Sequence, residues 1–229
     1  MNIGVIIQAR MSSKRLPGKI LLPILGKPML AYTVERIKRA RLVDHVVIAT
    51  SVETSDDPVE EFCKKYGVDC HRGPLENIAQ RLLQVIEKYH LDAFVRICAD
   101  SPFVDQQIID QAVKLFRGGD YDMVTNTLVR SFPKGQSVEV VGAKVFREAY
   151  KNFSAPGDFE HVTSYFHAHP SQFKIHNFSA PVDNNAVQLS VDTPKDFEMA
   201  KRILESMDRP HFEYGFGDIL KIYSRIAAV

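Results

Sequence analysis

The sequence predicts an α/β fold, in which helices cover both faces of a doubly wound, mostly parallel sheet that carries a small mixed α+β insertion. Through the first 120 residues, apolar runs of strand length alternate strictly with amphipathic helical segments. The apolar runs show little polar alternation, which is typical of strands buried on both faces. Glycine, proline and acidic residues separate the segments, and they mark where helices begin and end.

The first half of the chain is predicted to consist of strand–helix units. The run "IGVIIQA" at 3–9 is a buried strand, and the helix after the next loop begins near Pro28. That helix places Leu30, Val34 and Ile37 on one apolar stripe. The same reasoning predicts further strands at 45–50, 68–73 and 92–100, and further helices at 56–67, 75–90 and 106–119.

From about Tyr121 the strict alternation ends, and the pattern becomes mixed. No internal repeat or long linker separates this part from the rest, so we expect one domain, 1–229, with an insertion at about 127–187. We predict strands at 121–127 and 135–142, helices at 143–152 and 158–170, antiparallel strands at 173–181 and 186–192, and closing helices at 193–207 and 215–226.

Composition limits the class of protein. The 229 residues are 45% hydrophobic, which is enough for one sizeable core. A net charge of +1 argues against a general nucleic-acid or membrane-surface binder. Three cysteines without C-x-x-C spacing favour a reducing, cytoplasmic setting. The apolar start is too brief for a signal peptide, and no stretch approaches the roughly 20 apolar residues that span a bilayer.

The segment "RMSSKRLPGK" at 10–19 follows the first strand and carries a cluster of cations. Pro17-Gly18 interrupts any helical period, so the segment is predicted to be a loop. Ligands of open α/β sheets bind at the carboxyl ends of strands, and cations beside free backbone N–H groups hold phosphates there. The two common phosphate-binding glycine motifs are absent. An alternative is that Arg10 and Arg15 merely pin the loop to neighbouring carboxylates.

The opening "IIQARMSSKRLPGKILLPILGKPML" resembles that of the sugar cytidylyltransferases, which include the CMP-Kdo synthetases and acylneuraminate cytidylyltransferases. The resemblance continues through "HRG", "VRICADSPFVD", "VEVV", "EHVT" and "VDTPKDFE", and it is strongest to the SpsF-type branch of spore-coat polysaccharide synthesis. It implies a Rossmann-like fold of the nucleotide-diphospho-sugar transferase type. It also implies a homodimer that transfers CMP from CTP to a sugar, for surface or spore-coat polysaccharide synthesis, and releases pyrophosphate.

The resemblance assigns roles to residues at matching positions. Arg10 and Lys19 are the implied catalytic residues, with Lys19 close to the reacting phosphate. Arg72 and Gly73 would approach the nucleotide, although a tight strand-to-helix turn is an alternative role for both. The implied nucleotide-binding set is Ala9, Arg10, Ser13, Arg15, Lys19, Arg72 and Gly73.

Asp100 and Asp192 end two predicted strands, and the resemblance implies that they bind Mg²⁺ between them. Magnesium prefers carboxylate, phosphate and water oxygens, so these residue types suit it. Asp192 has an alternative role at a helix start, because Thr193 and Asp196 form a T-x-x-D capping arrangement. Asp105 is expected to cap the next helix.

The acceptor side of the site is less defined. Glu139 is a candidate contact to the sugar or a second metal, with an outward-facing strand residue as the alternative. His161 is a candidate sugar contact or a structural histidine. The family pattern predicts an acidic residue two positions before Glu139, where this chain has Ser137, which leaves the acceptor open.

Three other functions stay open at this point. The same fold accepts other nucleotides, such as GTP with a sugar-1-phosphate. A nucleotide-binding partner protein without catalysis would keep the same loop. A glycosyltransferase would need a D-x-D motif, whereas "ADSP" supplies one aspartate.

Overall fold

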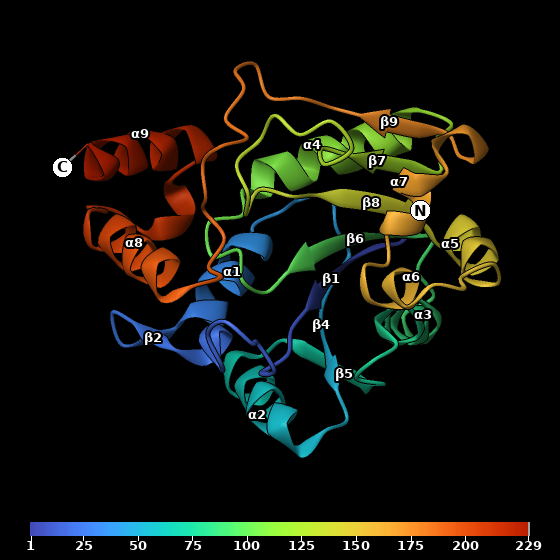
Figure 1. The fold of residues 1–229 in the computed structure, drawn as a ribbon, viewed down its shortest axis with the longest axis horizontal. Helices are drawn as coiled ribbons and strands as arrows, with labels where there is room; N and C mark the ends of the chain where they lie inside the picture. The colour runs from blue at the N-terminus through green and yellow to red at the C-terminus, as the bar shows by residue number, and fades with distance from the viewer. Residues whose placement is uncertain (229) are drawn as a thin grey trace.

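The computed structural model describes residues 1–228, and a seven-stranded sheet forms its centre (Figure 1). The strand order is β5-β4-β1-β6-β8-β7-β9. β8 pairs antiparallel with both of its neighbours, and the other pairings in this sheet are parallel. The strands are β1 Ile3–Gln8, β4 His45–Ser51, β5 Asp69–Gly73, β6 Ala93–Cys98, β7 Met123–Thr125, β8 Glu139–Gly142 and β9 Ile175–Asn177.

Helices cover both faces of the sheet, as the strand–helix alternation predicts. The α-helices are α1 Met29–Ile37, α2 Asp57–Tyr66, α3 Ile78–Lys88, α4 Gln106–Gly118, α5 Ala143–Tyr150, α6 Pro156–Glu160, α7 Ser164–Ala168, α8 Pro194–Glu205 and α9 Phe216–Ala227. The short 3-10 helices are η1 Lys19–Leu21, η2 Thr54–Asp56, η3 Pro170–Gln172 and η4 His211–Glu213. None of the helices described within residues 1–228 combines the length and apolarity needed to cross a bilayer.

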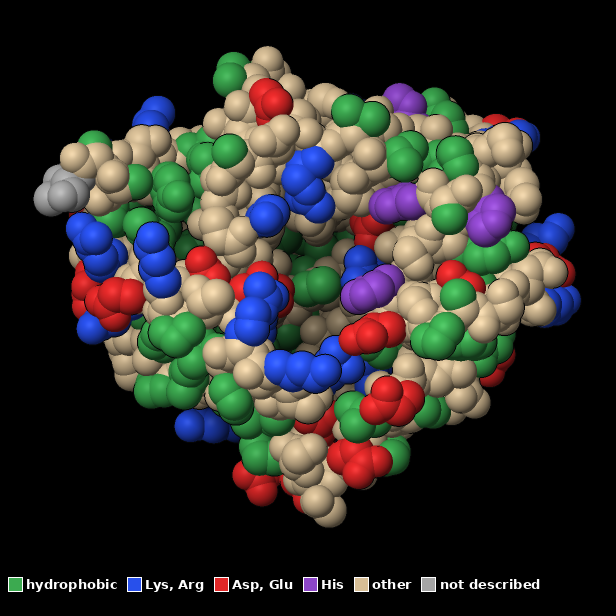
Figure 2. Space-filling model, viewed as in Figure 1, with side chains coloured by type: hydrophobic (Ala, Val, Ile, Leu, Met, Phe, Trp, Pro, Cys, Tyr) green, Lys and Arg blue, Asp and Glu red, His purple; other side chains and the backbone are tan. Residues whose placement is uncertain are grey.

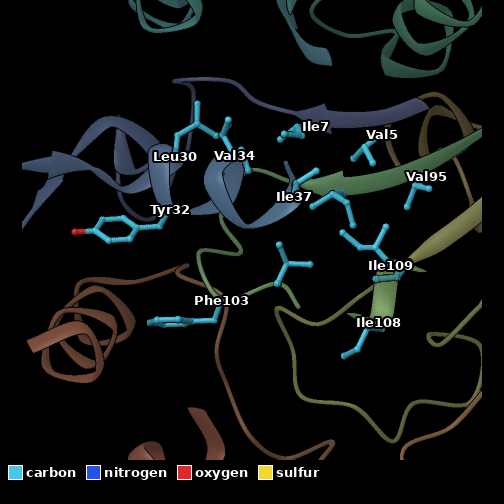
Figure 3. Close-up of a cluster of buried hydrophobic side chains, with 14 of the residues drawn as sticks. Val5, Ile7, Leu30, Tyr32, Val34, Ile37, Val95, Phe103, Ile108 and Ile109 are labelled. Atoms are coloured by element: carbon cyan, nitrogen blue, oxygen red, sulfur yellow. The ribbon is translucent and has the colours of Figure 1, made fainter. Parts of the chain in front are cut away.

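The side chains of β1 show how the two faces are filled. Val5 and Ile7 pack with α1 and α4 on one face, where Figure 3 shows them among the apolar side chains of those helices. Ile6 points the other way and packs with α3 and α5. All three are fully buried, and burying such a side chain contributes about 1.5–3 kcal/mol. The helices therefore close both faces, and the carboxyl ends of the strands are left for a ligand.

Three expectations for the second half are wrong in detail. The helix expected at 158–170 is two short helices, α6 and α7, with His161 between them. β9 pairs with β7 in parallel, not antiparallel, because the chain returns to the sheet edge through α5–α7. The strand expected at 186–192 forms only one bridge, between Lys134 and Gln188.

A small antiparallel pair, β2 Pro23–Ile24 and β3 Lys27–Pro28, was not expected. It turns through Leu25 and Gly26, whose φ angles of 49° and 76° are both positive. The segment 127–187 supplies β8 and β9 to the main sheet, so its strands are continuous with the rest of the fold.

Candidate active site

A cavity of about 340 Å³ lies over the carboxyl ends of β1 and β6. Figure 2 shows it as a hollow near the middle of one face, with Lys and Arg side chains along part of its rim. The cavity is lined by Gln8, Ala9, Arg10, Ser12, Ser13, Arg15, Lys19, Ile20, Ile78, Arg81, Arg96, Cys98, Ala99, Asp100, Glu160, His161 and Asp192. The loop after β1, the end of β6 and the segment before α8 therefore meet at one site.

The loop at 10–19 is held by its own backbone and by one buried carboxylate. The carbonyl of Met11 accepts hydrogen bonds from Ser13 and Gly18, and the Met11 N–H donates to Asp56 Oδ1 at 2.7 Å. Asp56 is 1% exposed, and burial favours its neutral form, but bonds from Ser51 and Met11 outweigh this and lower the pKa of Asp56. This anchoring fixes the path of the loop along the cavity.

Lys19 lies between the two aspartates that the sequence singles out. Its Nζ donates to Asp100 Oδ2 at 2.8 Å, to Asp192 Oδ1 at 3.0 Å and to the Val191 carbonyl at 2.6 Å. Burial opposes the charge of this ammonium group, but Asp100 and Asp192 outweigh it and raise the pKa of Lys19. A charged lysine is thus held next to two carboxylates at the floor of the cavity.

Within residues 1–228 no strand pairing joins Asp192 to Asp100. Other tertiary contacts bring the two residues together. The Val191 N–H donates to the Asp100 carbonyl at 2.9 Å. Residues 189–190 pass so close to Gly135 that a Cβ there would lie 2.6 Å from the Ser190 nitrogen. Gly135, with φ 95°, is therefore required for this approach.

The capping alternative for Asp192 is not what the structure shows. Thr193 and Asp196 form the capping box of α8, with Asp196 N donating to Thr193 Oγ1 at 3.3 Å. Asp196 Oδ2 also accepts the backbone N–H of Asp192 at 3.0 Å. The Asp192 side chain is left to face Lys19. Asp105 does cap α4, as expected, by accepting the Gln107 N–H at 2.8 Å.

The aspartate pair has the chemistry of a divalent-cation site that a ligand completes. Within residues 1–228, no group of three or more His, Cys, Asp or Glu side chains gathers as a metal site. Two carboxylates beside a cationic loop nevertheless match Mg²⁺, which commonly takes one or two carboxylates and fills its shell with phosphate and water oxygens. Asp100 and Asp192 are the residues that would hold it.

Arg10 and Arg15 both line the cavity and both form ion pairs. Arg10 pairs with Glu160 at 2.9 Å, and Arg15 pairs with Asp192 at 2.8 Å. Both arginines therefore form ion pairs, as the alternative expected, and also line the cavity. Ala9 and Ser13 also line the cavity, and His161 lies on its rim as an exposed side chain.

Arg72 and Gly73 do not form part of the cavity wall. Arg72 pairs with Asp57 and Glu60 of α2, at 2.6 and 2.9 Å, and its Nε donates to the Ser51 carbonyl. These contacts fit the turn role that was the alternative for this residue. Gly73 ends β5 beneath the side chain of Arg81.

Glu139 is buried, so it neither faces solvent nor lines the cavity. Its carboxylate, 3% exposed, accepts from Arg96 at 2.7 Å and lies 3.3 Å from His167 Nε2. Burial alone would raise its pKa, but His167 and Arg96 outweigh burial and hold the pKa of Glu139 at about 2. Ser137 Oγ accepts a hydrogen bond from Arg130.

Gln8, Arg81 and Arg96 are among the cavity residues that sequence reasoning missed. Arg96 lies in β6, and its Nε donates to Gln8 Oε1 at 2.8 Å. Arg81 occupies a helical position next to the apolar residues Ile78 and Leu82, and all three are buried. A charged residue within an apolar stripe is the signal that could have identified Arg81.

This fold, with a cationic loop behind β1 and two carboxylates facing it, defines an α/β nucleotidyltransferase. The chain belongs to the cytidylyltransferase family, whose model matches residues 4–221. This bears out the expected family and fold class, and it makes the protein an enzyme of that family.

Individual relatives agree with this assignment. The spore coat polysaccharide biosynthesis protein SpsF of Bacillus subtilis is 34% identical over 219 residues, covering 91% of this chain and 89% of the relative. A cytidylyltransferase structure from Leptospira borgpetersenii superposes with a TM-score of 0.95 at 30% identity, covering 100% of this chain and 96% of the other. The structure of a CMP:2-keto-3-deoxy-manno-octonic acid synthetase complexed with CTP has the same fold, with a TM-score of 0.68 at 19% identity over 90% of this chain and 99% of that one.

Proposed function

We propose that the protein transfers CMP from CTP to a hydroxyl group of a sugar acid and releases pyrophosphate, with Mg²⁺ as its cofactor. The observation that carries this proposal is the position of Lys19, which contacts Asp100 and Asp192 within a cavity lined by Arg10 and Arg15. A triphosphate needs such cations, and a bound metal needs such carboxylates.

The residues suit the bond changes of this reaction. The sugar oxygen bonds to the α-phosphorus of CTP, the bond from that phosphorus to the bridging oxygen breaks, and pyrophosphate leaves while the hydroxyl proton passes to solvent. Arg10, Ser13 and Arg15 hold the triphosphate, with the Ala9 backbone beside it. Lys19 stabilises the charge that develops on the phosphate oxygens, and positioning with such stabilisation supplies most of the catalysis.

Mg²⁺ held by Asp100 and Asp192 would neutralise phosphate charge and help orient the acceptor. Lys19 keeps these two carboxylates together at the cavity floor, since its Nζ contacts both. The two carboxylates therefore share one site before any ligand binds.

The acceptor is placed at the Gln8 and Arg96 side of the cavity, with His161 at the rim. The Gln8 Nε2 atom is buried without a hydrogen-bond partner within residues 1–228, so it is a donor that a sugar oxygen satisfies. Glu139 acts here through Arg96, whose orientation it fixes. The names of SpsF and of the 3-deoxy-manno-octulosonate cytidylyltransferase of Zea mays support a sugar acid used in surface or spore-coat polysaccharide synthesis.

The proposal also includes a cytoplasmic homodimer, with 127–187 as its contact region. Three free cysteines support a reducing compartment. The free edge of β9, at one end of the sheet, supports this segment as the place where a second copy docks.

The test measures pyrophosphate release with each of the four NTPs, combined separately with 3-deoxy-manno-octulosonate, N-acetylneuraminate and glucose 1-phosphate. We expect release with CTP and a sugar acid, and its loss when EDTA replaces Mg²⁺. Release with GTP and glucose 1-phosphate alone would instead identify a sugar-1-phosphate guanylyltransferase. Binding of CTP without release in any combination contradicts catalysis and indicates a nucleotide-binding partner protein.

A further inference from the structure

Two of the three cysteines lie outside the active-site cavity, where helix α2 packs beside β5 at the edge of the sheet (Figure 1). Cys63 is in the last turn of α2 and is buried, and Cys70 is the second residue of β5 and is partly exposed. Neither is among the residues that line the cavity. The proposed transfer reaction therefore gives these two thiols no role.

The alternation of side chains along β5 directs Cys70 towards α2. Successive side chains of a strand point to opposite faces of the sheet. Arg72 pairs with Glu60 of α2 at 2.9 Å. His71 lies on the other face, where its Nε2 is 3.0 Å from Gln84 of α3. Cys70 shares the face of Arg72, two residues away, and so points towards α2.

The periodicity of α2 brings Cys63 to the same place. Cys63 follows Glu60 by three residues, so the two side chains share one face of the helix. The chain reverses between helix and strand, with the Val68 N–H donating to the Cys63 carbonyl at 3.1 Å, so α2 and β5 run in opposite directions. One turn forward along α2 thus matches two residues back along β5. The contact between the thiols lies one helical turn beyond the Arg72–Glu60 ion pair.

The two thiols are hydrogen-bonded, and one of them is the more reactive. The bond from the Cys63 thiol lowers the pKa of Cys70, although burial opposes the charge of the thiolate. Arg72 and Lys88 also favour the Cys70 thiolate, and Glu60 opposes it. The same hydrogen bond, together with burial, raises the pKa of Cys63. Thiolates attack oxidants, so Cys70 is the nucleophile and Cys63 is the resolving thiol beside it.

We propose that Cys63 and Cys70 form a reversible disulfide when a hydroperoxide reaches the protein, which makes this dithiol a redox modification site. With hydrogen peroxide, the Cys70 sulfur bonds to one oxygen, the O–O bond breaks, and the released hydroxide takes up a proton and leaves as water. Cys63 then attacks the sulfenic sulfur, so that an S–S bond forms, the S–O bond breaks, and a second water leaves with the Cys63 proton. The two thiols lose two electrons and two protons, which reduce the peroxide to water. This inference is independent of the proposed transfer reaction.

The experiment exposes the native protein to a small excess of hydrogen peroxide, alkylates the remaining thiols and maps the cysteine peptides by mass spectrometry. We expect two of the three thiols to be lost, with the Cys63 and Cys70 peptides joined and Cys98 still alkylated. Cys98 is the internal control, because β6 lies three strand spacings, or about 14 Å, from β5, and burial raises the pKa of Cys98. Dithiothreitol should restore all three thiols.

Two variants separate the nucleophile from the resolving thiol. Cys63→Ser keeps the nucleophile and a hydroxyl that donates to it, so Cys70 should accumulate as a sulfenic acid that dimedone traps. Cys70→Ser should lose the rapid reaction and leave Cys63 and Cys98 open to alkylation. Urea unfolding of both variants guards against misfolding, and Cys70→Ser changes the less buried of the two positions.

The oxidised protein shows whether the native fold places the two sulfurs together. A disulfide that fits the fold should raise the urea midpoint, because the cross-link restricts the unfolded chain. A lower midpoint overturns the proposal, since the disulfide would then form only in an opened chain. Oxidation of Cys98 before Cys70, or of all three thiols at one rate, overturns it as well. None of these measurements involves pyrophosphate release, so failure of the proposed function is detected separately.

Discussion

The two arginines of the loop at 10–19 and those of the inner wall of the cavity differ in how they are neutralised. Arg10 and Arg15 are 36% and 64% exposed, and each pairs with a carboxylate that water also reaches. On the wall, Arg96 pairs with a carboxylate that is 3% exposed, and Arg81 is buried without one. Exposed pairs contribute only about 0–1 kcal/mol and exchange partners readily, whereas buried charges hold fixed positions.

This difference suggests a division of labour in the site. Under the proposed function, the two loop arginines exchange their exposed carboxylates for a triphosphate at little cost. The wall presents donors whose orientation does not change when the ligand arrives. Flexible charge therefore suits phosphates, which accept hydrogen bonds from many directions, and rigid donors suit the parts of the ligand that must be told apart.

The largest effect is expected at the floor of the cavity, where the two regions meet. Asp192→Asn removes one charge from the pair around Lys19, so Mg²⁺ binds more weakly and the triphosphate is less well placed. We expect kcat to fall by about 1000-fold, similar to removal of one transition-state contact, and the Mg²⁺ concentration for half-maximal activity to rise.

Rates of pyrophosphate release across a Mg²⁺ titration check this prediction. Asp120→Asn is the matched control, since Asp120 is 92% exposed and pairs with Lys174 outside the cavity lining. Native rates and a native Mg²⁺ requirement in Asp192→Asn would remove Asp192 from the metal site.

A smaller effect is expected for the ion pair between Arg96 of the inner wall and Glu139, and it concerns the stability of the fold. Glu139→Gln leaves the half-buried Arg96 without its charged partner and puts an uncharged side chain in the buried position, which should lower the free energy of unfolding at pH 7 by about 3 kcal/mol. The exposed pair Glu148–Lys151 gives the comparison, because Glu148→Gln should leave the free energy of unfolding nearly unchanged. Urea unfolding measures both.

The pH dependence of stability sharpens the same comparison. The pKa of Glu139 is about 2 in the folded protein and about 4.3 in an unfolded chain. Its contribution to stability is therefore complete above the unfolded value and is lost as the pH falls towards 2. The Glu139→Gln variant should show a shallower loss of stability across this range, and an unchanged slope would contradict the assignment.

The smallest effect is expected at Glu160, which forms an ion pair with Arg10. Burial is slight, and the bond from Arg10 lowers the pKa of Glu160, so the carboxylate stays ionised and competes with phosphate at neutral pH. Glu160→Gln should tighten CTP binding by about twofold to threefold, consistent with a weak exposed ion pair. Calorimetry tests this, with the effect expected to vanish in an Arg10→Gln background. Weaker CTP binding in Glu160→Gln would mean that Glu160 contacts the ligand.

Sequence reasoning was most successful where the signal is local. The alternation of apolar runs and helices predicted the parallel strands β1, β4, β5 and β6, because buried parallel strands need continuous apolar residues. The capping roles of Asp105 and of Thr193 with Asp196 are also local, and the structure has both. The second half was less predictable, because β9 pairs with β7 across 50 residues and no short-range pattern sets its direction.

The candidate site likewise contains residues that the sequence made candidates and contacts that only the fold creates. The positions at strand ends and the family resemblance made the loop at 10–19, Asp100 and Asp192 candidates, and the structure brings both aspartates to Lys19 of that loop. Arg96 and Glu139 are 43 residues apart in the chain, and they become direct neighbours only because β6 and β8 pair in register.

By itself, the sequence determined that this is an α/β protein with a cationic loop behind its first strand, because strand burial and loop composition depend on neighbours along the chain. Only the tertiary structure decided which charges remain unpaired. Arg72 and Arg81 are both arginines beside the same turn, but one reaches the carboxylates of α2 and the other faces the cavity. Whether a charge meets a partner depends on distances across the fold, and these are fixed only when the helices pack on the sheet.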